Sequence, residues 1–241
     1  MLELKGLSKT FGGVQAVRDV SLHMAAREVR GLIGPNGAGK TTLINLISGI
    51  LAHNSGSLSL DGRSLDGKKA DQRAGLGISR TFQNLRVFPN LSVAQNIDVG
   101  RYTAARAGRD TRALVEAAIS EFDLTERLVE PAQSLSYGHQ RRLEIVRALA
   151  TGPKLLMLDE PAAGMNEKET EALGRSLAWV RGQSDTAIMV IDHDLKFIMS
   201  LCDEVTVMNM GAVIADGSPD EITKNPQVID AYLGEDHEDA A

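Results

Sequence analysis

A glycine-rich loop carries the clearest chemical signal in this sequence. The loop "GPNGAGKTT" at residues 34–42 contains the pattern G-x-x-x-x-G-K-[ST], and it lies between an apolar segment, "EVRGLI", and a helical one, "TTLINLISGI". Glycines allow backbone N–H groups to surround phosphate oxygens, and the N-terminus of the following helix adds a favourable dipole. The loop therefore predicts a binding site for the phosphates of a nucleotide.

Individual positions of this loop have distinct expected roles. Lys40 is expected to reach the β- and γ-phosphates, and Thr41 to offer its hydroxyl to Mg²⁺. The other expected nucleotide-binding positions of the loop are Gly34, Pro35, Asn36, Gly37, Ala38, Gly39 and Thr42. Because a strand precedes the loop and a helix follows it, we favour this interpretation over a glycine-rich turn that binds nothing.

Two adjacent carboxylates end a second apolar segment, "LLMLDEP". Side chains at the carboxyl end of a parallel sheet face the ligand crevice, and neighbours on a strand point in different directions. Asp159 is therefore placed to hold Mg²⁺, directly or through water, and Glu160 to polarise an attacking water. Phosphoryl transfer to water needs both functions, because it requires charge compensation by a metal and a positioned nucleophile.

A second possible anion site occurs in "LSYGHQRRLEIVRAL" at residues 135–149, which is typical of a loop that enters a helix. Ser136 could cap this helix. Arg141 and Arg142 would then lie near its N-terminal end, where the helix dipole disfavours positive charge unless an anion is close. That anion could be a bound phosphate or nearby carboxylates, and the sequence leaves both open.

Alternating strand and helix patterns predict the elements that position these residues. Apolar runs at 28–33, 154–159 and 186–192 are typical of strands buried on both faces, and each leads through a polar turn into a helical pattern. This alternation predicts a parallel sheet with crossover helices. The segments "LELKGLSKTF", "VRDVSLHM" and "SGSLSLDG" predict β-structure near the N-terminus. A helical stretch is expected at 84–133 with Ser92 as an N-cap, and "EVTVMNMGAVIADG" predicts a β-hairpin.

Composition excludes several classes of protein. The 241 residues carry a net charge of −6, which argues against a nucleic-acid partner held by a broad basic face. A single cysteine, Cys202, fits a reduced, cytoplasmic setting. No segment approaches the ~20 apolar residues of a membrane helix. The first residues lack the apolar core of a signal peptide, so we expect neither a spanning segment nor export.

Five segments, in chain order, resemble the motifs of the ATP-binding-cassette (ABC) ATPases: "GPNGAGKT", "TFQ", "LSYGHQRR", "LLMLDEP" and "IDHD". The resemblance covers essentially the whole chain and implies ATP and Mg²⁺ as cofactors. It implies an α/β fold of the P-loop NTPase class, with a mostly parallel RecA-like core, an N-terminal antiparallel β subdomain and a helical signature subdomain at about 84–150. The expected ABC ATPase domain covers residues 1–235, and the acidic residues 236–241 are expected to be disordered.

The resemblance also implies roles for residues outside the phosphate loop. In this family the signature loop contacts the γ-phosphate of an ATP that is held by a second ATPase subunit. Ser136 and Gly138 are therefore expected to bind the ATP of a partner. Gln83 is expected to touch Mg²⁺ and the attacking water, and His193 to contact the γ-phosphate. With Glu160, these two side chains make up the expected catalytic set.

Some positions carry the family pattern less closely. Phe11 is expected to stack on the adenine, since stacking needs only an aromatic face, and Val17 is a further expected nucleotide contact. In the signature loop, Tyr137 replaces a glycine and His139 replaces a glutamine. Asn166 stands where many members have an aspartate, so the hydrogen-bonding shape remains but the charge is lost. We expect these departures to tune the rate and not to abolish activity.

The segments "PAAGMN", "SRTFQNLRVFPNLSVAQNI" and "KNPQVIDAYLGE" resemble one subgroup, the longer of the two ATPase subunits of branched-chain amino-acid importers. This implies an ATP hydrolase at the cytoplasmic face of the inner membrane, bound to transmembrane permease subunits, paired with a second ATPase subunit and served indirectly by a solute-binding protein. Phe88, Leu91 and Val93 are candidate exposed contacts for the permease, and the alternative for each of them is a place in the internal core. The alternatives are a urea or amide importer, a lipopolysaccharide exporter, or a soluble ABC ATPase outside transport.

Overall fold

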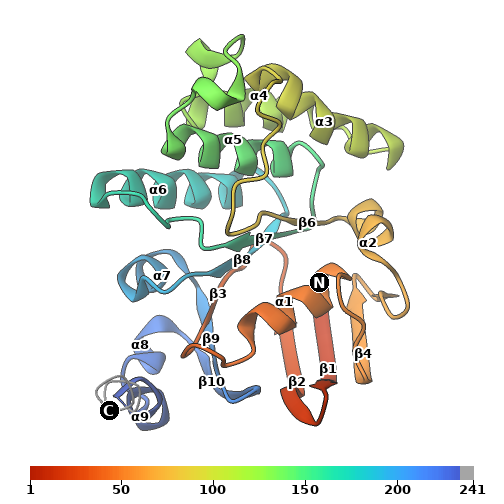
Figure 1. Ribbon diagram of the computed structural model, residues 1–241, viewed down its shortest axis with the longest axis vertical. Helices are drawn as coiled ribbons and strands as arrows, with labels where there is room; N and C mark the ends of the chain where they lie inside the picture. Colours follow the sequence, from red (N-terminus) through yellow and green to blue (C-terminus); the bar gives the residue numbers. More distant parts are fainter. Residues whose placement is uncertain (234–241) are drawn as a thin grey trace.

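A six-stranded sheet forms the centre of the molecule (Figure 1). The structure, a computed structural model, describes residues 1–233. Five neighbouring strands pair in parallel, and only the edge strand β10 pairs antiparallel, with β9. The predicted parallel sheet and the predicted hairpin are therefore confirmed. In spatial order the strands are β10 (Ala212–Gly217), β9 (Glu204–Asn209), β3 (Val29–Ile33), β8 (Ala187–Ile191), β7 (Leu155–Asp159) and β6 (Ile78–Arg80).

Side chains of the central strands enter two hydrophobic cores, because successive residues of a strand point to opposite faces. Leu156 and Leu158 of β7 pack in one core, with α5 (Tyr137–Leu149), α6 (Glu167–Gln183) and α7 (Leu195–Leu201). Leu155 and Met157 pack in the other, with α1 (Lys40–Ser48). Burial on both faces explains why these strands are apolar throughout and do not alternate with polar residues.

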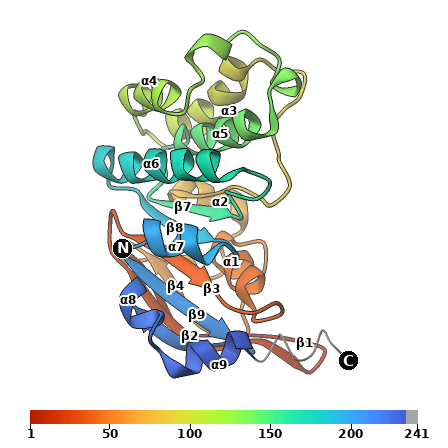
Figure 2. The same cartoon turned by 90° about the vertical axis from the view of Figure 1, so that its left-hand side faces the viewer.

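A second, antiparallel sheet covers the α1 side of the molecule (Figures 1 and 2). This sheet contains the three N-terminal segments in which β-structure is predicted. Its strand order is β2 (Val14–Met24), β1 (Leu2–Phe11), β4 (Ser55–Leu60) and β5 (Arg63–Ser64). The short helix α2 (Ala70–Leu76) then leads back to the edge strand β6 of the central sheet. The phosphate loop lies between β3 and α1, in contact with both sheets.

A helical layer lies at the opposite end of the molecule from this antiparallel sheet (Figures 1 and 2). It consists of α3 (Val93–Arg106), α4 (Arg112–Glu121), two 3₁₀ turns, η1 (Thr125–Arg127) and η2 (Ala132–Ser134), and α5. Ser92 caps α3 as predicted, because its hydroxyl accepts a hydrogen bond from the backbone N–H of Gln95. The prediction that Val93 is exposed is wrong, since this side chain is fully buried in the core. Phe88 is 46% exposed.

Two further helices, α8 (Pro219–Ile222) and α9 (Pro226–Leu233), follow the hairpin and pack against it. Among residues 1–233, no helix combines the length and the apolar character needed to cross a membrane. The acidic segment 236–241, for which disorder is predicted, lies outside the described residues.

Candidate nucleotide-binding site

The backbone of the phosphate loop requires glycine at two positions. Gly34 has a φ of +144° and Gly39 a φ of +100°. A Cβ atom at Gly34 would lie 2.0 Å from the carbonyl oxygen of Met208, and one at Gly39 would lie 2.3 Å from that of Ala16. The loop is thus held against strand β9 and the N-terminal sheet at distances that no side chain permits. Its path is set before any ligand binds.

The N-terminus of α1 opens toward this loop. Gly39 is the N-cap of α1 and offers no capping side chain, and the first turn of this helix contains no acidic residue. Backbone N–H groups and the helix dipole at this end are available to an anion. Asn36, Gly37 and Thr41 are exposed, and Lys40 donates hydrogen bonds from Nζ to the carbonyl oxygens of Gly34 and Pro35, the latter at 2.7 Å. Ala38 is buried beneath the loop.

Asp159, at the end of β7, forms an ion pair with Arg80 at the end of β6. Arg80 Nη2 lies 2.7 Å from Asp159 Oδ2, and the two side chains are 8% and 13% exposed. Arg80 Nη1 also donates to Oδ1 of Asn45 in α1, at 2.6 Å. One arginine therefore joins the carboxylate to the helix that follows the phosphate loop. Sequence reasoning missed Arg80, because nothing in a three-residue edge strand marks its partner.

Glu160 contacts the glutamine predicted to act with it. Gln83 Nε2 donates to Glu160 Oε2 at 2.9 Å, although the two residues are 77 positions apart. Glu160 has a φ of +47°, which is uncommon for a residue with a side chain. Its backbone N–H donates to the carbonyl oxygen of Ile191 in β8 at 2.7 Å. The structure therefore brings the ends of β6, β7 and β8 together around this carboxylate.

His193 follows β8, and its side chain is 76% exposed. The preceding Asp192 is buried, and its two carboxylate oxygens accept hydrogen bonds from the backbone N–H groups of Ala162 and Asp194. Asp192 thus ties the loop after Glu160 to the loop that carries His193. Its position directly after a buried strand was the one signal in the sequence for this role.

Ser136 caps α5, since its hydroxyl accepts a hydrogen bond from the backbone N–H of His139 at 3.4 Å. The serine is exposed, and Gly138 beside it is partly exposed. The carboxylate of Glu169 in α6 lies beside Gly138, because a Cβ there would be 3.4 Å from Oε1. Both signature residues therefore lie at the surface, in one turn at the start of α5.

The arginines near the start of α5 have carboxylate partners. Arg141 is fully buried, and its Nη1 lies 2.9 Å from Glu144 Oε2. Arg142 Nη1 lies 3.7 Å from Oδ2 of the exposed Asp123. Burial raises the pKa of Glu144 and the charge of Arg141 opposes that rise. The sequence left open whether a bound phosphate or nearby carboxylates would meet these two arginines. In the described structure, carboxylates meet both of them.

Arg141 also connects α5, the signature helix that follows the signature loop, to the loop that carries Gln83. Its guanidinium donates to the backbone carbonyl oxygens of Phe82 and Gln83, each at 2.7 Å, and to the hydroxyl of Tyr137 at 3.2 Å. The Tyr137 ring in turn lies against the loop after Glu160, because a Cβ at Gly164 would be 3.3 Å from it. The tyrosine that replaces a glycine of the family pattern therefore bridges two loops of the candidate site.

The two residues predicted to contact the base differ in exposure. Phe11, at the end of β1, is 44% exposed, and Lys9 Nζ lies 5.1 Å from the centre of its ring. Val17 is fully buried in the core shared by the N-terminal sheet and α1. In this structure the ring of Phe11 is therefore accessible to a ligand, whereas the side chain of Val17 is not.

The donor set suits Mg²⁺. Among residues 1–233, no group of three or more His, Cys, Asp or Glu side chains gathers into a metal cluster. Mg²⁺ needs no such cluster, because it is commonly held by one or two protein oxygens together with phosphate oxygens and water. The Thr41 hydroxyl, the Gln83 amide oxygen and the Asp159 carboxylate are hard oxygen donors of this kind. These residues would hold the ion next to the phosphates.

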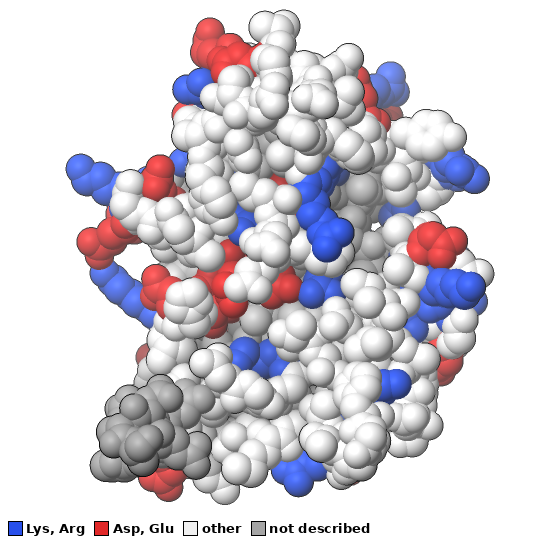
Figure 3. Space-filling view, in the orientation of Figure 1, with Lys and Arg blue, Asp and Glu red and all other residues white. Residues whose placement is uncertain are grey.

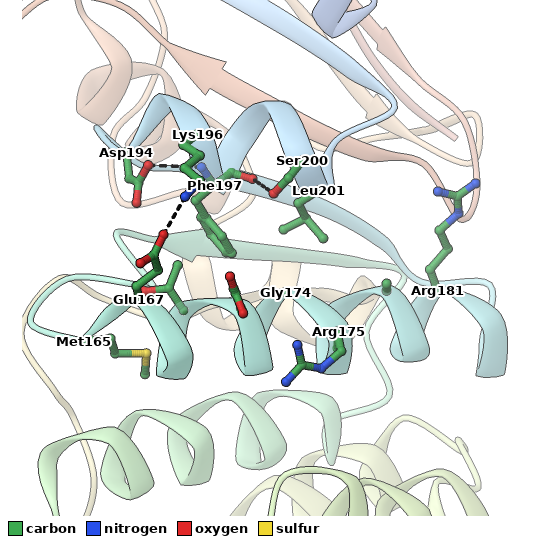
Figure 4. A pocket seen from close by; sticks show the side chains of 13 residues that line it. Met165, Glu167, Gly174, Arg175, Arg181, Asp194, Lys196, Phe197, Ser200 and Leu201 are labelled. Atoms are coloured by element: carbon green, nitrogen blue, oxygen red, sulfur yellow. Dashed lines mark hydrogen bonds and ion pairs between the residues drawn. The ribbon is translucent and has the colours of Figure 1, made fainter.

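A separate pocket of about 730 Å³ lies between α6 and α7 (Figure 4). Apolar side chains, including Met165, Phe197 and Leu201, form part of its wall. At one end Lys196 of α7 pairs with Glu167 of α6 at 2.5 Å. This pocket contains none of the phosphate-loop residues. Its lining includes Met165 and Glu167, on either side of Asn166, and Asp194, next to His193.

Charge on the visible face is mixed. In Figure 3, Lys and Arg side chains are separated from one another by acidic and uncharged ones. This distribution agrees with the acidic net charge and does not resemble the basic stripe of a nucleic-acid-binding surface.

Comparison with known proteins agrees with this geometry. A family model described as "ABC transporter" matches residues 17–163, and one described as "Branched-chain amino acid ATP-binding cassette transporter" matches residues 212–238. The chain is 42% identical to the high-affinity branched-chain amino acid transport ATP-binding proteins LivG of Salmonella typhimurium and BraF of Pseudomonas aeruginosa, over 98% of each chain. It is 34% identical to the lipopolysaccharide export system ATP-binding protein LptB of Escherichia coli, over 98% of both chains.

Solved structures extend the comparison. An ATP-binding cassette of an ABC transporter in its ADP conformation superposes with a TM-score of 0.85 at 26% identity, covering 97% of this chain and 98% of its own. The cbiO1 protein of Clostridium perfringens superposes with a TM-score of 0.82, also at 26% identity, covering 97% and 94%. The predicted fold class is confirmed, and the chain belongs to the ABC transporter family as one of its ATP-binding proteins.

Proposed function

We propose that this chain is the ATP-hydrolysing subunit of an importer of branched-chain amino acids. The observation that carries the proposal is the 42% identity to LivG and BraF over 98% of the chain. The match of residues 212–238 to the branched-chain family model supports it independently of the nucleotide-binding motifs. In this role the chain docks at the cytoplasmic face of the membrane through permease subunits, and a solute-binding protein delivers the amino acid to them.

Hydrolysis follows from the side chains gathered at the sheet edge. Lys40 and the N-terminus of α1 bind the phosphates, and Phe11 stacks on the adenine. Glu160, oriented by Gln83, accepts a hydrogen bond from the attacking water and aligns it with the γ-phosphorus. The bond between the γ-phosphorus and the bridging oxygen breaks as the water oxygen adds, Glu160 takes up a proton of that water, and ADP and inorganic phosphate are released. Thr41, Gln83 and Asp159 would hold Mg²⁺, which would supply charge compensation when bound.

A second ATPase subunit completes the site in this proposal. Ser136 and Gly138 of one subunit contact the γ-phosphate bound by the other, and His193 contacts the same phosphate from the side of its own subunit. Closure of the two subunits over two ATP molecules moves the permease, and hydrolysis reopens them. The exposure of Ser136 and His193 in the single chain supports such an arrangement, since each side chain is accessible to a ligand or a partner.

Transport by the reconstituted complex tests this function. The chain would be assembled in proteoliposomes with the permease subunits, the second ATPase and the solute-binding protein of its transporter. We expect ATP-dependent uptake of labelled leucine, isoleucine and valine, and no uptake of urea. Preferential urea uptake, or ATP-driven extraction of lipopolysaccharide with no amino-acid uptake, would contradict the assignment of substrate.

A further inference from the structure

The hydroxyl of Ser136 lies in a hydrogen-bonded chain that includes an imidazole and a carboxylate. Ser136 Oγ is 2.8 Å from His139 Nδ1, and His139 Nε2 is 3.3 Å from Asp123 Oδ2. The His139 side chain is 22% exposed, whereas the serine next to it is exposed. The partly enclosed ring of His139 therefore joins the hydroxyl of Ser136 to the carboxylate of Asp123, in the turn after α4.

Other charged groups surround this chain of contacts. Arg142, one turn further along α5, lies 3.7 Å from the same Asp123 oxygen that faces the ring. Glu169 approaches from α6 and lies beside Gly138. The ring thus faces Asp123 in the turn after α4, Arg142 of α5 shares that carboxylate, and Glu169 of α6 lies beside Gly138. Asp123 orients both the ring and the arginine.

Hydrogen counting fixes the direction of each contact. An ionised carboxylate only accepts, so the hydrogen between Asp123 and the ring belongs to His139 Nε2. In the neutral ring, Nδ1 is then an acceptor, and the hydroxyl of Ser136 donates its only hydrogen to it. In the doubly protonated ring, Nδ1–H donates to Ser136 Oγ instead, and the serine hydrogen is released to point outward. Phosphate oxygens accept hydrogen bonds, so only the second arrangement lets Ser136 donate to them.

We propose that His139, oriented by Asp123, is a positioning residue that sets the direction of the Ser136 hydroxyl hydrogen. Protonation of the His139 ring turns this hydrogen toward the terminal phosphate of a nucleoside triphosphate that a second subunit holds. The inference rests on the proposed function, in which Ser136 meets that phosphate. The protonated ring also places a positive charge near the phosphate. Nδ1 of the protonated ring donates and Nδ1 of the neutral ring accepts, so this contribution depends on the protonation state of His139.

Glutamine is the matched variant for His139. Its amide can donate or accept a hydrogen bond without changing charge over this range, and it is the residue of the usual family pattern. His139→Ala removes the side-chain partner of Ser136 and leaves only the backbone N–H of residue 139. Asp123→Asn keeps the size of the orienting side chain, but its amide can donate as well as accept, so it no longer fixes which ring nitrogen carries the hydrogen.

Long-range ¹H–¹⁵N spectra of the imidazole rings test the arrangement in the isolated chain. The chain has five histidines, and His139→Gln assigns the signals of residue 139 by their loss. We expect the neutral His139 ring to carry its hydrogen on Nε2 in the wild type, and Asp123→Asn to yield a mixture of both tautomers. A wild-type ring with its hydrogen on Nδ1 would overturn the proposal, whatever the activity of the protein.

The ATPase rate of the assembled transporter tests the consequence. We expect kcat of the wild type, divided by kcat of His139→Gln, to fall about fivefold from the acidic to the basic end of the pH range over which the protein is stable, as one hydrogen bond to the phosphate is lost. The ratio cancels the effects of pH that the two proteins share. His139→Ala should lower kcat about fivefold at the acidic end, with rescue by Gln. A ratio independent of pH would overturn the proposal about His139. An inactive wild-type assembly would overturn the proposed function instead, and the tautomer measured in the isolated chain would then decide the proposal about His139.

Discussion

Gln83 donates a hydrogen bond from Nε2 to the Oε2 atom of Glu160 at 2.9 Å, linking the loop after β6 to the end of β7. The backbone of Gln83 is held in turn by Arg141 of the signature helix. Hydrogen bonds thus connect Glu160, the proposed base, to Gln83 and through it to Arg141 of α5, all within one subunit. Movement of the helical layer against the sheet would be transmitted to the carboxylate through two hydrogen bonds.

Glu160→Gln should separate binding from hydrolysis. The amide keeps the shape of the side chain and can still meet Gln83, but it cannot take a proton from water. We expect nucleotide affinity close to that of the wild type and an ATPase rate about 10²- to 10⁴-fold lower. Equilibrium binding of ATP and steady-state hydrolysis would be measured on the same preparation. Rapid turnover by this variant would show that another group positions the water.

Lys40→Ala should weaken nucleotide binding. Removal of the ammonium group deletes charge-assisted hydrogen bonds to the β- and γ-phosphates, so we expect affinity for ATP to fall about 10- to 100-fold and hydrolysis to be lost. Lys224→Ala, an exposed lysine after α8, is the control and should bind ATP normally. Calorimetric titration measures both. Equal affinity of the two variants for ATP would show that Lys40 is not part of the nucleotide-binding site.

Arg141→Met should destabilise the fold far more than Arg142→Met. Arg141 is fully buried against Glu144, and its loss leaves a buried carboxylate and two backbone carbonyl groups without their partner. We expect a loss of about 3 kcal/mol in the free energy of unfolding. Arg142 faces an exposed Asp123 at 3.7 Å, so its removal should cost less than about 1 kcal/mol. Urea denaturation measures both, and similar midpoints would contradict the role of Arg141 as a link between loops.

Cys202 should resist alkylation in the folded protein. Burial raises the pKa of this thiol to about 12, with a further contribution from Asp203. Only the thiolate reacts, so iodoacetamide at about pH 8 should modify the native chain at least about 100-fold more slowly than the urea-unfolded chain. Mass spectrometry follows the reaction. Comparable rates in the two states would mean that α7 opens readily and exposes the sulfur.

Residue type alone predicts the framework of this site, but not the contacts that hold it. The central strands β3, β7 and β8 are apolar because both faces are buried, and that pattern is local in sequence. The ion pair of Arg80 with Asp159 spans 79 residues and begins in a strand of three residues, too short for a periodic signal. The exposure of Val93 was predicted wrongly for a similar reason, because burial depends on helices that pack from elsewhere in the chain.

The signature helix shows the same limit. That two arginines near its N-terminus require an anion follows from the helix dipole. Which anion they meet depends on tertiary structure, and here Glu144 and Asp123 provide it. The role of His139 likewise could not be predicted, since the sequence marks it only as a departure from a family pattern. Its contact with Asp123 appears only when α4 and α5 pack together.

The central claim, that Ser136 serves the ATP of a second subunit, is tested most directly by distributing two substitutions over a dimer. Ser136→Arg spoils only the signature loop, and Lys40→Ala spoils only the phosphate loop. A mixed dimer of these two variants retains one composite site with both elements intact, whereas a mixed dimer of wild type and the double variant retains none. Where the natural partner is an unlike ATPase, the corresponding substitutions are divided between the two subunits.

Separately tagged subunits allow each mixed dimer to be isolated in the assembled transporter, and the ATPase rates of the two arrangements to be compared. Both arrangements contain the same two substitutions, so only their distribution differs. The account predicts hydrolysis when the substitutions are on different subunits and almost none when they share one subunit. Equal rates, or the reverse order, would show that the signature loop acts on the ATP of its own subunit and would contradict the account.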